Sequence, residues 1–316
     1  MSTLINGLHH VTAMASGAQP NLDFYVGVLG LRLVKKTINF DAPDIYHLYY
    51  GDGAGSPASI MTVFPFRNMH RGRRGTGQLT ATAFSIAADA VGYWTDRLQK
   101  LNVPFDGPAR RLGEEVITLH DPDDLELELV AGDDPRSGWQ NDAIAPGMEI
   151  KGFHSVALCL EGYEHTAQLL TEVMEHRLVA EEHNRFRFTT GDGGAGRYVD
   201  LVCMPDAQAA LPGSGTVHHV AFSTDTDQTQ LAFRDKLLAS GFANVTPVLD
   251  RQYFHSIYYR EPGGVLFEVA TDPPGFAVDE SPESLGTTLK LPQWLEPRRA
   301  AIARSLPQIT VPTVRA

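Results

Sequence analysis

One apolar pattern recurs four times along this chain of 316 residues, and this repetition limits the folds open to the chain more than any other feature. Each copy holds about six residues that alternate or run apolar, as a β-strand requires. The copies are LHHVTAM at 8–14, LTATAFSI at 79–86, FHSVALCL at 153–160 and VHHVAFST at 217–224. The repeat predicts that one supersecondary unit is built four times.

The same elements follow each of these strand-like segments. An amphipathic stretch with apolar residues spaced at three and four predicts a helix. Further strands come next, separated by a turn rich in Gly, Asp or Pro. The helices are expected at 20–30, 90–101, 165–178 and 228–241, and the turns at 51–57, 120–126, 191–196 and 261–265. The unit is therefore β-α-β-β-β, and the predicted fold class is α+β.

A single unit of this kind has an open sheet face and unpaired strand edges. Two units are therefore expected to close on each other around a cleft, so that four modules give two incomplete barrels. The polar, Pro- and Gly-containing segment 131–149 is the expected linker. It separates a domain of modules 1 and 2 at 1–130 from a domain of modules 3 and 4 at 150–271. A Pro-rich tail follows at 272–316, with one helical stretch around 297–305.

Two histidines stand at the same position of the repeat. His10 in the first unit and His219 in the fourth are equivalent, where the second and third units have Ala81 and Ser155. A lone strand histidine is usually structural, but two in one register predict a site between units 1 and 4. Glu268 adds a carboxylate to the apolar strand VLFEVA, although alone it would be interpreted as an edge residue facing water. Two imidazoles and one carboxylate form the facial triad that binds non-haem Fe(II) and leaves coordination positions open.

The chain offers neither a fourth ligand at this site nor a second site with two histidines and a carboxylate. Unit 1 has Met61 and Thr62 where a fourth ligand would come, and neither is a carboxylate, so a closed four-ligand site is disfavoured. Units 2 and 3 carry Glu128 and Asp200 at equivalent positions but no histidine, since His154 is one residue out of register. We therefore expect that pair to be structural or degenerate, and one face of the segment LELELV to be solvated.

Further polar residues are expected near the site. Tyr258 and Arg251 lie in the strands or turn that lead to Glu268. A tyrosine can exchange a hydrogen bond with a phenol oxygen, and an arginine can hold an anionic oxygen. Ordinary strand packing explains Tyr258 nearly as well. His9 and His218 precede the two ligand candidates, and strand alternation turns them away from the metal unless the strand is bulged or ends there.

The motifs HHVTA, FYVGVLGLRLV, HHVAF and GGVLFEVA resemble the vicinal-oxygen-chelate superfamily, also called the glyoxalase/bleomycin resistance/extradiol dioxygenase superfamily. Within it, MTVFPF at 61–66, GFHS at 152–155 and YYREPGGVLFE at 258–268 resemble the ring-cleaving dioxygenases of para-hydroquinones, and this resemblance covers nearly the whole chain. It implies the same four-module fold and Fe(II) bound by His10, His219 and Glu268. It also implies catalytic roles around the metal for His9, Thr12, His218, Arg251 and Tyr258.

Composition narrows the choice of partners. A net charge of −12 gives no general attraction to nucleic acid or to an anionic membrane surface. No apolar run approaches the roughly 20 residues of a membrane span, and the start, MSTLINGLHH, lacks the features of a signal peptide. Cys159 and Cys203 lie in apolar segments and are expected to be reduced thiols of a cytoplasmic protein, with a disulfide between them left open.

These expectations combine into one function with two rivals. We expect an Fe(II)-dependent, extradiol-type ring-cleaving dioxygenase that inserts O₂ into a small hydroquinone-like aromatic, substituted or chlorinated rings included. Mn or Zn can occupy the same ligands in a purified sample. A glyoxalase-like isomerase or lyase would need a fourth protein ligand, and a metal-free binding protein of the resistance type leaves the matched register of His10 and His219 unexplained. The sequence leaves open the exact substrate and the position of cleavage. It also leaves open the oligomeric state, and a homo-oligomer is one of the states that it allows.

Overall fold

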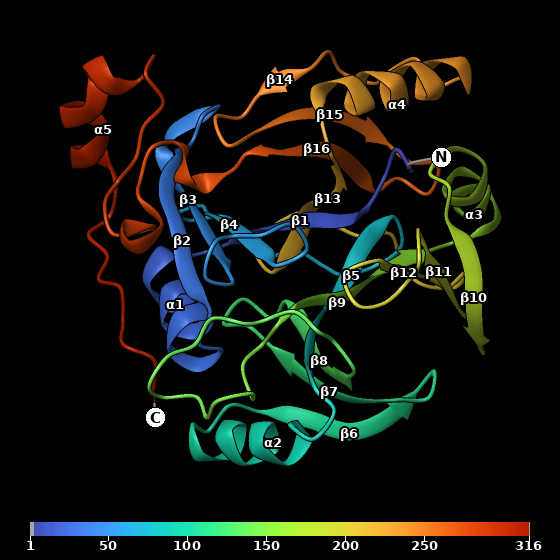
Figure 1. Ribbon diagram of the computed structural model, residues 1–316, viewed down its shortest axis with the longest axis horizontal. Coiled ribbons are helices and arrows are strands. Elements are labelled where there is room, and N and C mark those ends of the chain that lie inside the picture. The colour runs from blue at the N-terminus through green and yellow to red at the C-terminus, as the bar shows by residue number, and fades with distance from the viewer. Residues whose placement is uncertain (1–2, 316) are drawn as a thin grey trace.

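The computed structural model describes residues 3–315 and contains two curled eight-stranded sheets with the helices outside them (Figure 1). One sheet combines the first and fourth modules, so blue and orange strands lie together in the upper part of Figure 1. The other sheet combines the second and third modules. The predicted α+β fold of four modules in two incomplete barrels is therefore confirmed. The first and fourth modules pair, as the site between them requires, so each barrel takes one module from 1–130 and one from 150–271.

The first barrel is one continuous sheet. Its strands are β1 (Gly7–Ala15), β2 (Arg32–Asn39), β3 (Ala42–Gly51), β4 (Ile60–Pro65), β13 (Thr216–Thr224), β14 (Leu249–Asp250), β15 (Phe254–Arg260) and β16 (Leu266–Pro274). Their order is β14-β15-β16-β13-β1-β4-β3-β2. The central strands β1 and β13 pair antiparallel, and each has a parallel neighbour, β4 and β16. The barrel is therefore roughly symmetric about the β1–β13 pair.

The second barrel repeats this plan. Its strands are β5 (Gln78–Ala87), β6 (Phe105–Arg111), β7 (Glu114–His120), β8 (Glu126–Gly132), β9 (Gly152–Leu160), β10 (Arg177–Glu182), β11 (Arg185–Thr189) and β12 (Tyr198–Cys203). Their order is β10-β11-β12-β9-β5-β8-β7-β6, with β5 and β9 antiparallel at the centre. Every residue of β1 and of β9 is buried. Strands covered on both faces are mostly apolar, which explains why these segments show little alternation.

The helices cover the outer faces of the sheets. They are α1 (Ala18–Leu22), α2 (Val91–Lys100), α3 (Glu164–Gln168), α4 (Asp227–Ala239) and, in the tail, α5 (Arg299–Ser305). Short π-helical segments extend α1 through Asp23–Val28 and α3 through Leu169–Val173. The third helix ends before the expected residue 178 because β10 begins at Arg177. Within residues 3–315, every helix is too short or too polar to cross a membrane.

The central strands carry β-bulges at equivalent places in both barrels. In the β1–β13 ladder the register shifts at His9 and at His218, and in the β5–β9 ladder it shifts at Thr80 and at His154. In each case the extra residue directly precedes the position aligned by the repeat. A bulge changes the direction of the side chain that it carries. The alternation rule therefore fails at this one position of every module.

The tail after the fourth module packs on the first. The ammonium group of Lys35 on β2 is fully buried and lies 2.6 Å from a carboxylate oxygen of Asp279 and 2.6 Å from one of Glu280. The ring of Phe276 packs against those of Tyr49 and Tyr253, with centroids 5.0 and 5.1 Å away. A buried cation requires such partners, so the tail is an integral part of the first barrel.

Candidate metal centre and active-site cavity

Strand register brings His10, His219 and Glu268 together. His10 on β1 pairs with Ala221 on β13, and Ala221 pairs with Glu268 on β16. His219 lies two residues before Ala221 and shares its face of β13. The three side chains therefore face the same interior from three adjacent strands.

The three candidate ligands converge on one point. His10 Nε2 lies 3.2 Å from His219 Nε2 and 3.2 Å from Glu268 Oε2, and His219 Nε2 lies 2.9 Å from the same oxygen. Each of the three residues is at most 5% exposed. Ser256 donates a hydrogen bond to Glu268 Oε1, whereas Oε2 has no hydrogen-bond partner among residues 3–315. A carboxylate oxygen left unpaired at this depth is costly, and a cation held between the three atoms would satisfy it.

The electrostatics of the site favour the protonation states that bind a metal. Burial raises the pKa of Glu268, but the two imidazoles lower it by more and hold the pKa well below its usual range. Burial lowers the pKa of His219. An ionised carboxylate and a neutral imidazole are the forms that bind divalent metals. The residues present therefore fit a divalent cation.

A second imidazole lies behind each of the two histidines. His9 Nδ1 is 2.9 Å from His10 Nδ1, and His218 Nδ1 is 2.8 Å from His219 Nδ1. Removal from bulk solvent lowers the pKa of His9 to about 3 and that of His218 to about 4. Each is neutral near pH 7 and can accept the Nδ1 proton of its neighbour, which leaves Nε2 available as a ligand. Regular strand alternation would turn His9 and His218 the other way, but both residues are bulged, which is the exception left open for them.

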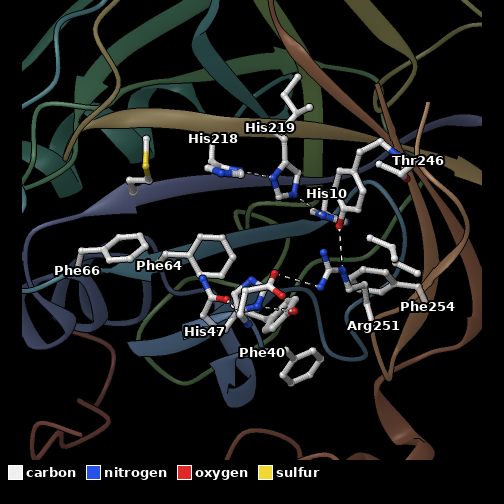
Figure 2. Close-up of a pocket in the computed structure, with 17 residues that line it drawn as sticks. His10, Phe40, His47, Phe64, Phe66, His218, His219, Thr246, Arg251 and Phe254 are labelled. Atoms are coloured by element: carbon white, nitrogen blue, oxygen red, sulfur yellow. Dashed lines mark hydrogen bonds and ion pairs between the residues drawn. The ribbon is translucent and has the colours of Figure 1, made fainter. Parts of the chain in front are cut away.

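Two of the three converging side chains, His10 and His219, line a cavity of about 510 Å³ (Figure 2). Cavities of this size enclose small organic ligands. The lining combines an apolar surface with a few polar groups. In Figure 2, His10 and His219 lie on one side of the cavity, and His47 and Phe40 lie on the other. The lining residues are His10, Met14, Asn39, Phe40, Asp41, His47, Tyr49, Phe64, Phe66, His218, His219, Thr246, Leu249, Arg251, Phe254, Tyr258 and Leu266.

Tyr258 and Arg251 form the cavity wall beside His219. Tyr258 pairs with Glu268 in the β15–β16 ladder, and its ring lies edge-on to that of His219 with centroids 5.8 Å apart. Arg251 Nε donates a hydrogen bond to the Tyr258 hydroxyl at 3.3 Å, and Arg251 Nη1 lies 3.4 Å from Asp41 Oδ2. Burial raises the pKa of Tyr258 above its usual value. Since arginine only donates, the Tyr258 proton remains available for a ligand in the cavity.

Thr12 does not line the cavity but begins a chain of polar side chains behind its wall. Thr12 Oγ1 lies 2.9 Å from Thr62 Oγ1, which lies 2.7 Å from His47 Nε2. His47 Nδ1 in turn lies 2.8 Å from the Tyr49 hydroxyl. Burial lowers the pKa of His47 well below its usual value. His47 and Tyr49 thus join the candidate site as neutral polar groups on the module 1 wall.

Sequence reasoning missed His47 and Tyr49. Tyr49 pairs with Thr62 in the β3–β4 ladder just as Tyr258 pairs with Glu268 in the β15–β16 ladder. The two tyrosines are therefore equivalent positions of modules 1 and 4. The signal that could have found them is the alternation in IYHLYY, which places His47 and Tyr49 on one face of β3.

The second barrel uses the same register for a different purpose. Glu128 and Asp200 occupy the position of Glu268 and are at most 2% exposed. Arg111 binds both oxygens of Glu128, and Arg187 binds both oxygens of Asp200. The expectation that the face of LELELV carrying Glu128 is solvated is wrong, because that face lies inside the barrel. The positive charges come from other strands of the same modules, 17 residues before Glu128 and 13 residues before Asp200.

The chain was also compared with known proteins. A family model described as "Glyoxalase/Bleomycin resistance protein/Dioxygenase superfamily" matches residues 7–129 and 152–269. The chain belongs to this superfamily. The two matched segments each cover two modules, and the residues between them contain the expected linker.

Relatives within the superfamily match along almost the full chain. MhqO of Bacillus subtilis (strain 168), a proposed ring-cleaving dioxygenase, is 42% identical over 301 residues, which cover 95% of each chain. A chlorohydroquinone/hydroquinone 1,2-dioxygenase of Sphingobium indicum is 32% identical over 309 residues, which cover 96% of each chain. Similarity of this extent includes both barrels and the tail.

Solved structures show the same architecture. The crystal structure of a proposed dioxygenase from Bacillus subtilis subsp. subtilis str. 168 matches with a TM-score of 0.95 at 40% identity, covering 99% of this chain and 100% of that one. Glyoxalase I from Zea mays matches with a TM-score of 0.63 at 14% identity, covering 84% of this chain and 92% of that one. The second match shows the superfamily fold alone.

Proposed function

We propose that this protein is an Fe(II)-dependent dioxygenase that cleaves the ring of a small hydroquinone-like aromatic. The observation that carries the proposal is the convergence of His10 Nε2, His219 Nε2 and Glu268 Oε2 beside a cavity of about 510 Å³. The relatives support it, since one is named as a hydroquinone dioxygenase and another is a proposed ring-cleaving dioxygenase. Extradiol-type cleavage, with incorporation of both oxygen atoms, is part of the proposal.

The ligand set favours iron over a closed metal site. Two imidazole nitrogens and one carboxylate oxygen on one side of a metal are typical of non-haem Fe(II) and leave positions for substrate and O₂. Thr62 stands where a fourth ligand would come, because it pairs with Thr12 as Glu268 pairs with Ala221. Its hydroxyl is engaged by Thr12 and His47. This arrangement argues against a four-ligand isomerase, although Mn or Zn can occupy the same three ligands.

The bound iron would supply a Lewis acid and a path for electrons from the aromatic ring to O₂. The chain's own residues prepare that chemistry. His9 and His218 each fix the orientation of the neighbouring ligand through Nδ1. The Tyr258 hydroxyl, held by Arg251, donates toward an oxygen of the ring or of the product. Arg251 also places a fixed positive charge on the cavity wall, which favours anionic forms of the substrate and product.

The apolar part of the wall holds the ring and limits water. The ring of Phe254 lies 5.0 Å from that of His10, and the ring of Phe64 lies 6.0 Å from that of His218. Aromatic side chains at these positions can pack on the faces and edges of a bound ring. Burying a ring in an apolar pocket is favourable by roughly 25 cal/mol per Å² of apolar area. The cavity therefore suits a flat aromatic substrate with a small number of oxygen substituents.

The test is oxygen uptake by protein loaded anaerobically with Fe(II). We expect one Fe(II) per chain and uptake of O₂ with para-hydroquinones in a panel that also contains catechols and simple phenols. Zn(II)-loaded protein serves as the control, because it keeps the ligands and lacks redox chemistry. Turnover of a hemithioacetal without O₂ uptake would contradict the proposal and favour an isomerase. Tight binding of the rings without any metal requirement would favour a binding protein.

A further inference from the structure

In the hydrogen-bonded chain on the module 1 wall, the donor and the acceptor of each hydrogen bond can be assigned. Its members are Thr12, Thr62, His47 and Tyr49, joined by contacts of 2.9, 2.7 and 2.8 Å. Each hydroxyl has one proton to donate, and a neutral imidazole has one N–H and one acceptor nitrogen. Four groups with four protons form three internal hydrogen bonds. One proton is therefore left over, and it lies at one end of the chain.

Thr12 and Tyr49 are both buried, so access to the cavity decides which end holds the free proton, and only Tyr49 lines the cavity. Thr12 is fully buried, and among residues 3–315 its hydroxyl contacts Thr62 alone. A buried hydroxyl proton without an acceptor costs about 1–3 kcal/mol, so Thr12 donates to Thr62. Thr62 then donates to His47 Nε2, and His47 Nδ1–H donates to the Tyr49 oxygen. The Tyr49 proton is the one without an acceptor in the protein.

The position of Tyr49 indicates which group can accept that proton. Tyr49 lines the same cavity as His10 and His219. Its strand, β3, is two strands away from β1, which is roughly 10 Å along the sheet. The Tyr49 hydroxyl has no hydrogen bond to His10, His219 or Glu268 among residues 3–315, and the ring of His47 stands between it and Thr62. An oxygen held by Tyr49 is therefore a different one from an oxygen held between the three candidate ligands, as on a ring that carries two oxygens.

We propose that the Tyr49 hydroxyl, held as a donor by His47, binds the second oxygen of a para-dioxygenated ring. This inference rests on the proposed function, because it takes an aromatic ring as the ligand and adds the group that recognises its far oxygen. Tyr49 touches the substrate. His47 is a positioning residue, since it acts by occupying the acceptor side of Tyr49 and is clamped between the rings of Tyr49 and Phe64, with centroids 4.0 and 4.3 Å away.

The proposal explains a choice between isomers of the substrate. A ring with adjacent hydroxyls directs both oxygens to one side and leaves the Tyr49 proton unpaired. A ring with opposed oxygens satisfies both ends of the cavity. Sites that leave a buried polar group unpaired discriminate strongly against the analogue that lacks its partner.

The test is anaerobic binding to the Fe(II)-loaded protein, so that binding is measured without turnover. The probes are hydroquinone, 4-methylphenol, which replaces the far hydroxyl with a methyl group of similar size, and 4-methoxyphenol, whose far oxygen can only accept. We expect the native protein to bind hydroquinone roughly 10- to 100-fold more tightly than 4-methylphenol. We expect 4-methoxyphenol to keep part of this advantage, because Tyr49 donates.

Variants separate the roles of the two residues. Tyr49→Phe should bring the affinities for hydroquinone and 4-methylphenol within about twofold of each other. His47→Leu should reduce the preference by less, roughly three- to tenfold, and should cause no further loss when added to Tyr49→Phe, since it acts through that hydroxyl. His47→Gln, which keeps an N–H donor, should restore part of the preference. Tyr46→Phe on the same strand removes a hydroxyl that donates to Pro307 O, and it serves as the matched control.

The outcomes distinguish this inference from the proposed function. A full preference for hydroquinone in Tyr49→Phe overturns the role of Tyr49 and leaves ring cleavage in place. A preference lost equally in Tyr46→Phe also overturns it. Additive losses in the double variant overturn the positioning role of His47. Failure of the native protein to bind any of the three phenols overturns both proposals together.

Discussion

The two barrels share one scaffold and treat the same buried carboxylate in opposite ways. At the register position of Glu268, the second barrel has Glu128 and Asp200. Both are neutralised by arginine side chains of the chain itself. Glu268 is approached instead by two imidazoles, which bring no fixed charge. The carboxylate therefore does not make the site, since three of the four modules have one; the residues that face it do.

The residues that face the carboxylate from the neighbouring strand also differ between the two barrels. Arg187 reaches from β11 to Asp200 and also to Glu114, and the bulged His154 contacts Glu114 as well. These side chains form a connected network in the interior of the second barrel. In the first barrel the position of Arg187 is occupied by Tyr258, which pairs with Glu268 at the same point of the ladder. Tyr258 makes no ion pair with Glu268 and lines the cavity instead, so the carboxylate is left to the two imidazoles.

Matched amide substitutions in the two barrels should give the largest difference. Glu268→Gln removes the anionic ligand, so Fe(II) affinity should fall by at least about 100-fold and O₂ uptake should be lost. Glu128→Gln removes an equivalent charge that faces Arg111, and its metal content should be unchanged. The measurement is iron per chain after desalting. Equal loss of iron from both variants would mean that the barrels are not divided in this way.

Removing the internal cation should damage the second barrel without touching the metal. Arg187→Met leaves Asp200 and Glu114 buried without their shared partner, and we expect a loss of about 3–5 kcal/mol in the free energy of unfolding. Arg177→Met, at an exposed arginine that contacts the Gly191 carbonyl, is the control and should change it by less than about 1 kcal/mol. Urea unfolding measures both. If Arg187→Met lowered the free energy of unfolding by no more than Arg177→Met does, the network would not be structural.

Tyr258→Phe tests whether the residue at the Arg187 position of the first barrel serves catalysis. The ring and its packing remain, and only the hydroxyl held by Arg251 is lost. We expect iron content to stay the same while kcat/KM falls roughly 10²- to 10³-fold, as for a positioned proton donor. Steady-state O₂ uptake and metal analysis of one preparation give both values. Unchanged kcat/KM on the substrate would reduce Tyr258 to a packing role.

The smallest effect concerns acid stability. Burial raises the pKa of Glu114, but His154 and Arg187 lower it by more, so that the pKa falls to about 2. A lowered pKa means that the carboxylate stabilises the fold above about pH 4.5 and that this stability is lost as the pH falls toward 2. The loss should be at most about 3 kcal/mol. Glu114→Gln should flatten the fall in the free energy of unfolding between pH 4.5 and 2, and an unchanged slope would contradict the assignment.

Repetition made much of the fold predictable. Four copies of one pattern indicate four modules, and the histidines at 10 and 219 indicate which modules pair, because a ligand set must be assembled from both. The register that brings Glu268 to the two histidines follows from the same alignment. The limits of the helices were less predictable, since α1 and α3 end in π-helical segments that periodicity does not reveal.

The rest of the site depends on features that do not repeat. His47 aligns with Ser256 of module 4, so comparison of the units gives no signal for an imidazole at that position. The orientation of His9 and His218 depends on bulges, which follow from pairing and not from local sequence. Arg111 neutralises Glu128 from a separate strand. A charge partner of this kind is set by three-dimensional neighbours, so the sequence suggested an exposed face.

The pairing of modules also sets the order in which the protein can be made. Modules 2 and 3 are consecutive in the chain, whereas β1 pairs with β13 across more than 200 residues. During synthesis the inner barrel can close once β12 has left the ribosome, while the first module waits with unpaired strand edges. Closing so long a loop makes the outer barrel the slow step of folding. The proposed metal ligands come together only in that last step, so we expect a nascent chain interrupted before Glu268 to have a folded inner barrel and an incomplete candidate metal site.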